Sequence, residues 1–125
     1  MINDFAAKNL ATHLENKAKD TVYAARLDDK VSELFLIKEI GVAWGLSYGA
    51  KHLRVHAEHY KSEEAALLNP SDMLADLDGT AEECLREAGC LANSVDLRMY
   101  YDGRVSGLMQ ARHSIHKAIE NWRPL

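Results

Sequence analysis

The segment from residue 41 to 59 reads GVAWGLSYGAKHLRVHAEH and has glycine at every fourth position before its histidines begin. An α-helix turns by about 100° per residue, so this segment would carry its glycines and histidines on one narrow stripe. Each glycine inside a helix costs about 1 kcal/mol relative to alanine, so we expect a close neighbour whose packing offsets that cost. The stripe therefore predicts close helix packing or an interface that involves Gly41, Gly45, Gly49, Trp44 and Tyr48.

Three kinds of neighbour can lie against such a bare helix edge: another helix of the same chain, a second copy of the chain, or a flat ligand. We favour the first, because segment 4–27 carries a row of small residues that allows a short interhelix distance. That row consists of Ala7, Ala11, Ala18 and Ala25. A second pair, Gly103 and Gly107, marks either another close contact or a weak start of the last helix.

Apolar residues recur at helical spacing along most of the chain, and no stretch alternates convincingly as a half-buried strand would. Asn3 or Asp4 can cap a first helix that ends near Leu27. A second helix is expected to begin near Asp29, where acidic residues suit a helix N-terminus, and to extend to about Leu68. The alternative is a break within 41–49 that divides it into two shorter helices.

Further along the chain, Gly79 is expected to end a short turn over 72–78. Thr80 and Glu83 then form a capping box that opens the next helix. The last helix is predicted over 95–122, and its apolar face carries Leu97, Tyr101, Leu108, Ile115, Ile119 and Trp122.

The composition fits an ordinary globular domain, with 47% hydrophobic and 27% charged residues in a chain of 125. A chain of this length is about the usual size of one domain. We therefore predict a single all-α domain, 1–125, built as a bundle of about four helices with one long central helix. One bundle of this size leaves apolar helix faces to cover, so we expect the chain to self-associate as a homodimer.

Three histidines follow the glycines on the same stripe. His52, His56 and His59 have a spacing that allows zinc or another divalent metal to bind one helix face. The sequence places no fourth ligand beside them, and clustered histidines also occur as a partly buried polar rim or an interface. We therefore expect no cofactor and keep a metal site as the alternative.

The charge of −4 is spread unevenly along the chain. Segment 62–89 contains eight acidic residues and one basic residue, Arg86. Such a segment is either a solvated surface or the contact for a basic surface of another protein. The acidic residues assigned to this contact are Asp72, Asp76, Asp78, Glu82, Glu83 and Glu87.

Aromatic and basic side chains alternate near the start of the last helix. Arg98, Tyr100 and Arg104 could stack a base and hold a phosphate, which gives a nucleotide site as a third hypothesis. The overall acidic charge argues against a nucleic-acid partner.

Catalytic signatures are missing from the sequence: GxSxG, HExxH, Walker A and GxGxxG do not occur. We assign no catalytic residue and do not expect an enzyme. Cys84 and Cys90 have neither disulfide nor CxxC spacing, no segment is apolar enough to span a bilayer, and no signal peptide is evident. These features favour a cytoplasmic, non-enzymatic interaction or regulatory module, of the size typical of phage- or plasmid-type accessory and inhibitor proteins.

Overall fold

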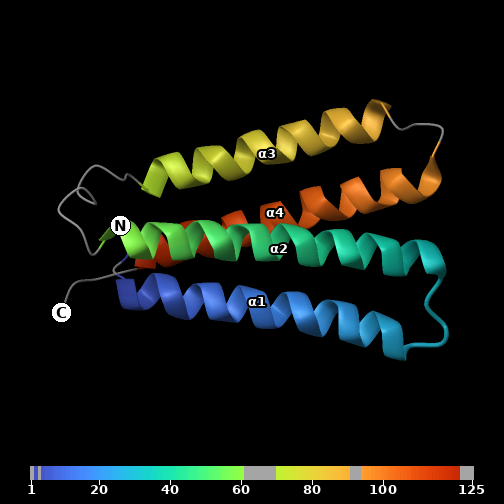
Figure 1. Ribbon diagram of the computed structural model, residues 1–125, viewed down its shortest axis with the longest axis horizontal. Coiled ribbons are helices and arrows are strands. Elements are labelled where there is room, and N and C mark those ends of the chain that lie inside the picture. The colour runs from blue at the N-terminus through green and yellow to red at the C-terminus, as the bar shows by residue number, and fades with distance from the viewer. Residues whose placement is uncertain (1, 3, 61–69, 91–93, 122–125) are drawn as a thin grey trace.

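A computed structural model describes residues 2, 4–60, 70–90 and 94–121 of the chain. These residues form four α-helices. The helices run alternately in opposite directions (Figure 1). They are α1 (Asp4–Leu27), α2 (Glu33–Tyr60), α3 (Pro70–Cys90) and α4 (Val95–Asn121). The described residues form no strand, so the predicted all-α class and four-helix bundle are confirmed. Length does not single out α2 as the central helix, because it has 28 residues and α4 has 27.

The connection between α1 and α2 differs from the prediction. Ser32 caps α2, because its Oγ accepts a hydrogen bond of 3.1 Å from the Phe35 amide. Asp28 instead closes a turn, in which its carboxylate accepts a hydrogen bond of 2.9 Å from the Lys30 amide. The prediction that this helix begins near Asp29 was therefore wrong, because α2 begins at Glu33. α2 continues through its three glycines without a break, and residues 61–68 of the expected segment lie outside the described residues.

The predicted stop at Gly79 was also wrong, because α3 runs through it from Pro70 to Cys90. Thr80 lies inside the helix and caps nothing. The apolar residues of α3 keep helical spacing on both sides of the glycine, so their burial outweighs its cost of about 1 kcal/mol. These buried residues are Met73, Leu77, Ala81, Cys84 and Ala88. Proline is tolerated at the first position of α3, where its missing amide hydrogen costs nothing.

The four helices form an open arrangement in which α2 and α4 are the inner pair. α1 packs against α2, α3 packs against α4, and α2 and α3 touch each other only slightly. Figure 1 shows this order from bottom to top as α1, α2, α4 and α3. The outer edges of the molecule are consequently formed by α1 and α3.

The glycines of α2 pack against α4, and not against the alanines of α1 as we had favoured. A Cβ atom on Gly41 would lie 3.0 Å from the Cα of Gly103, and one on Gly45 would lie 2.6 Å from the carbonyl oxygen of Arg104. Gly103 and Gly107 supply the matching bare edge of α4, facing the backbones of Lys38 and Val42. The second glycine pair therefore marks the other half of the same backbone contact.

The sequences of α2 and α4 correspond across this contact. Gly41 lies beside Gly103 and Gly45 beside Gly107, so the two helices run in the same direction. The local sequences read GVAWGL and GRVSGL, and the two leucines, Leu46 and Leu108, are fully buried. The molecule is thus two similar helical hairpins, α1–α2 and α3–α4, joined along their glycine edges.

The buried face of α1 is the one expected, with Ala7, Ala11, Leu14, Ala18 and Ala25 inside. The buried face of α4 includes Leu108 and Ile115 of the predicted face, but it also takes in the glycine edge and leaves out Leu97. Leu97 is 46% exposed, whereas Gly103, Gly107 and Ala111 are buried. The reason is that α4 packs its glycine edge against α2 while the neighbouring Leu108 and Ile115 enter the core. Trp122, the last residue of the predicted face, lies outside the described residues.

The glycine contact predicts opposite effects for the same substitution at two helical glycines. Gly45→Ala should lower the free energy of unfolding by about 2–3 kcal/mol, because the new methyl group meets the α4 backbone. Gly79→Ala, which meets nothing within 4 Å, should raise it by up to about 1 kcal/mol through helix propensity. Urea unfolding followed by circular dichroism measures both. Equal effects of the two substitutions would contradict the packing described here.

Candidate functional site

A groove runs between α2 and α3 and is floored by α4. It exists because α2 and α3 both pack on α4 but barely contact each other. Its volume is about 580 Å³. The lining residues are Trp44, Tyr48, Thr80, Glu83, Cys84, Arg86, Glu87, Tyr101 and Arg104. We call this the acidic–aromatic groove.

Aromatic rings form a row along the α2 wall of the groove. Trp44 and Tyr48 are stacked, with ring centroids 5.1 Å apart and an interplanar angle of 24°. His52 follows one turn later, with its ring 4.6 Å from that of Tyr48. Residues four apart on a helix share a face, which is why these three rings line up. Thr80 fixes the row to α3 by donating a hydrogen bond of 3.1 Å to the Tyr48 hydroxyl.

Arg104 reaches from α4 into the base of this row. Its guanidinium carbon lies 3.8 Å from the centroid of a Trp44 ring, 4.8 Å from Tyr100 and 4.9 Å from Tyr101. It also donates a hydrogen bond of 3.1 Å to the Tyr100 hydroxyl. Burial opposes its charge, but this hydrogen bond and the attraction of the tyrosines and Cys84 raise the pKa of Arg104. The cation is therefore held in an aromatic setting that favours it.

The thiol of Cys84 lies beside Arg104 and is almost fully buried. Burial raises the pKa of Cys84, although its hydrogen bond with Arg104 acts in the opposite direction. A thiol with a raised pKa is protonated at neutral pH and is a poor nucleophile. Cys84 is thus poorly suited to act as a nucleophile in this groove.

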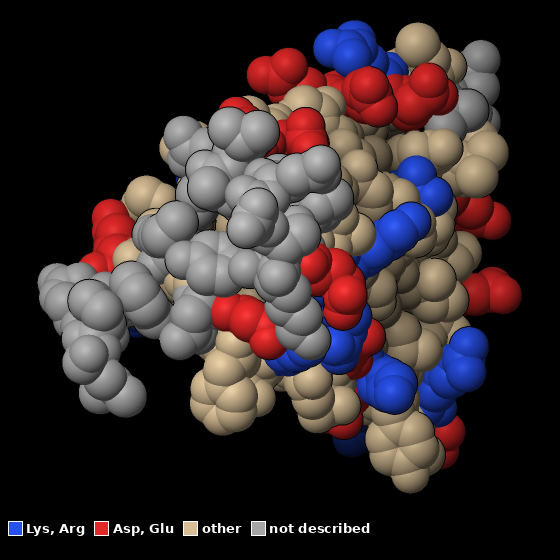
Figure 2. Space-filling model, turned by 60° about the vertical axis from the view of Figure 1, so that its left-hand side comes forward, with Lys and Arg blue, Asp and Glu red and all other residues tan. Residues whose placement is uncertain are grey.

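The α3 wall of the groove carries two carboxylates, Glu83 and Glu87, together with Arg86. Glu83 and Glu87 are exposed and lie one helical turn apart on it. Figure 2 shows acidic side chains gathered at the top of the molecule, at the level of α3. Of the other acids assigned to partner binding, Asp78 forms an ion pair of 2.6 Å with Arg112 that ties α3 to α4. Asp72, Asp76 and Glu82 are exposed on α3 outside the groove lining.

The three histidines of the predicted stripe are not equivalent. His52 is half-buried at the end of the aromatic row, whereas His56 is 3% exposed among core residues. The side chain of His59 lies outside the described residues. Among the side chains that are described, no three His, Cys, Asp or Glu residues come together as a metal site requires.

The residues of the nucleotide hypothesis are only partly brought together. Arg104 donates a hydrogen bond to Tyr100, while Arg98 is exposed and is not among the residues that line the groove. The guanidinium is stacked against aromatic rings, and Glu83 and Glu87 balance the charges of Arg86 and Arg104, so the groove offers a phosphate no net positive charge. The contact between Arg104 and Trp44 could not be predicted from the sequence. Helical spacing shows which residues share a face of one helix, but it does not show which other helix packs against that face.

Comparison with known proteins gives no relative: no protein-family model, no curated protein and no solved structure matches this chain. Within the described part of the chain, no helix combines the length and apolar character needed to cross a membrane.

Arg104 should contribute measurably to stability. Arg104→Ala removes the stacked guanidinium and is expected to lower the free energy of unfolding by about 1–2 kcal/mol. Arg98→Ala, at an exposed position of the same helix, should change it by less than about 0.5 kcal/mol. Chemical denaturation of both variants tests this. A loss of the same size at both positions would mean that the aromatic setting of Arg104 adds nothing.

His52 should make stability depend on pH. Burial lowers its pKa below 6.5, Asp76 partly restores it, and Lys51 lowers it further. Because the folded state binds the proton more weakly than the unfolded state, His52 favours folding above pH 6.5, and this contribution is lost as the pH falls through the lower folded-state pKa. The stability of the wild type relative to His52→Gln should therefore decrease between pH 7.5 and pH 5. A constant difference between the two proteins across this range would contradict the assignment.

Proposed function

We propose that this protein is a small, non-enzymatic interaction module that binds a basic segment of another protein in the acidic–aromatic groove. The observation that carries the proposal is the pairing of two walls: Glu83 and Glu87 on α3 face the ring row of Trp44 and Tyr48 on α2. Carboxylates attract lysine or arginine side chains, and aromatic faces stack on guanidinium groups and on the methylene stems that carry them.

Spacing supports a helical or extended basic partner. Glu83 and Glu87 are four residues apart on α3, so their Cβ atoms lie about 6 Å apart on one face of the helix. Two basic side chains one helical turn apart on the partner would meet both carboxylates. Arg104 supports the aromatic part of the argument, because a guanidinium already stacks against Trp44 in this groove.

A cytoplasmic location and a regulatory or accessory role form part of the proposal. Cys84 and Cys90 are both free thiols, which suits a reducing compartment. A module that binds without catalysing a reaction acts by covering a surface of its partner, as an inhibitor or an assembly factor does.

Binding of a designed probe tests the proposal directly. The probe is an amphipathic helical peptide with arginines at positions i and i+4, and its control carries glutamines at those positions. Fluorescence anisotropy should show that Glu83→Gln combined with Glu87→Gln weakens binding of the arginine peptide about tenfold. The matched variant Glu58→Gln with Glu82→Gln changes two exposed acids outside the groove and should bind as the wild type does.

Added salt should also weaken the wild-type interaction, since the contact joins opposite charges near the surface. Equal affinity for the arginine and glutamine peptides would refute the proposal. So would full affinity in the variant with both groove glutamates replaced.

A further inference from the structure

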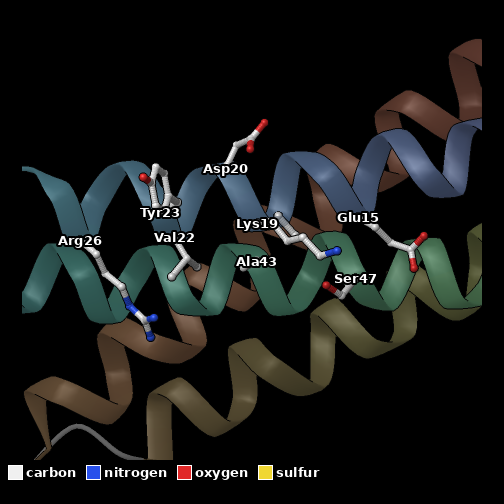
Figure 3. Close-up of a pocket in the computed structure, with 9 residues that line it drawn as sticks. Glu15, Lys19, Asp20, Val22, Tyr23, Arg26, Ala43 and Ser47 are labelled. Atoms are coloured by element: carbon white, nitrogen blue, oxygen red, sulfur yellow. The ribbon is translucent and has the colours of Figure 1, made fainter.

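A second groove lies on the other side of the inner helix pair, between α1 and α2 (Figure 3). Its volume is about 710 Å³. It is hollow because the residues between the two helices are small, namely Ala18 on α1 with Ala43 and Ser47 on α2. Val22, Tyr23 and charged residues of α1 complete the lining.

Two cations cross this groove. Lys19 and Arg26 are seven residues apart on α1, which places them on one face of the helix, about 10 Å apart. Figure 3 shows both side chains extending toward α2, while Asp20 points away on the far side of α1. The remaining acid, Glu15, is already engaged in an ion pair with Arg54. Within the described residues, neither Lys19 nor Arg26 forms an ion pair, so the groove presents two available positive charges over a floor of small residues.

The described chain carries a surface that complements this groove. Asp76 and Glu83 are exposed on α3 and are also seven residues apart. Gly79 lies between them, and a Cβ atom there would meet nothing within 4 Å. Asp76 and Glu83 form what we call the acidic ridge of α3. Its charge is opposite to that of Lys19 and Arg26, its two charged residues have the same seven-residue spacing, and Gly79 between them allows a close approach.

We propose that the α1–α2 groove receives the acidic ridge of α3 from a second copy of this chain. The inference rests on the proposed function in one respect, because both use α3 as an acidic contact surface. α1 and α3 form opposite edges of the molecule (Figure 1), so the two surfaces of one copy cannot meet each other. A contact between opposite edges is head-to-tail, so it builds an open row or a closed ring of copies rather than a dimer with one self-complementary interface.

Sedimentation of the full chain over a range of protein concentrations tests the proposal. The weight-average mass should rise with concentration and should fall back toward the monomer in high salt. Lys19→Glu with Arg26→Glu should weaken association at least tenfold, as should Asp76→Lys with Glu83→Lys. Lys17→Glu with Lys117→Glu reverses two exposed charges outside the groove and should associate as the wild type does. Circular dichroism checks that each variant keeps its helices.

Mixing the two defective variants gives the decisive measurement. The variant with the reversed groove still carries a native α3 ridge, and the variant with the reversed ridge still carries a native groove, so the mixture should regain association that neither shows alone. A chain that is monomeric at every concentration would overturn the proposal, as would association that is unaffected by the groove variant or not restored by mixing.

The same variants separate this inference from the proposed function. Lys19→Glu with Arg26→Glu leaves the acidic–aromatic groove unchanged and should bind the arginine peptide normally. A monomeric chain that binds the peptide would overturn the self-association alone. If the wild type associates but the unassociated Lys19→Glu, Arg26→Glu variant, in which Glu83 is uncovered, ignores the peptide, the peptide site alone is overturned.

Discussion

The backbone contact between α2 and α4 determines the rest of this architecture. Glycines on both helices remove every side chain from the line of contact, so the helix axes come closer than ordinary side chains would permit. Dispersion contacts and burial of the flanking Leu46 and Leu108 must outweigh the entropic cost of several mid-helix glycines. No other helix pair in the described part of the chain shows such an approach between glycines.

The close approach also explains where the acidic–aromatic groove lies. α2 and α4 occupy the middle, so α3 packs on α4 and leaves the acidic–aromatic groove beside α2. The second groove lies between α1 and α2, where the facing residues are small. The two inner helices carry different side chains at positions that correspond when their glycines are aligned. Trp44 and Tyr48 of α2 correspond to Ser106 and Gln110 of α4. The large rings make the α2–α3 cleft an aromatic site, whereas Ser106 and Gln110 bond to each other on α4. The resemblance between the hairpins is therefore one of packing, and their difference is one of surface chemistry.

Much of the fold could be predicted from helical spacing. The alanine face of α1, the all-α class and the need for a close neighbour at Gly41 and Gly45 all follow from spacing and residue size. The identity of that neighbour could not be predicted, because α1 offers alanines and α4 offers glycines, and a helical wheel does not say which helix lies opposite. The prediction that Gly79 ends a helix failed for a related reason. The free-energy cost of a glycine inside the helix is smaller than the stabilisation from burying the apolar residues on both sides of it.

The candidate site was less predictable than the fold. The acids of α3 and the aromatic–arginine segment of α4 were each recognised, but as separate sites for separate ligands. They share a groove because the register of α2 and α4 brings Trp44 over Arg104, and that register is set by glycines distant in sequence. The sequence of one helix suggests that the histidines form a single site. Packing against the neighbouring helices instead places His52 at the end of the groove and His56 in the core.

The division into two hairpins has a consequence for how the chain folds. Contacts within each hairpin join residues close in sequence, whereas the glycine contact joins residues about half a chain length apart and closes a long loop. Local pairing is the faster event, so we expect each hairpin to form early and their docking to limit the overall rate. Changes at the glycine edges would then slow folding itself, while changes on the exposed side of α3 would act mainly on unfolding.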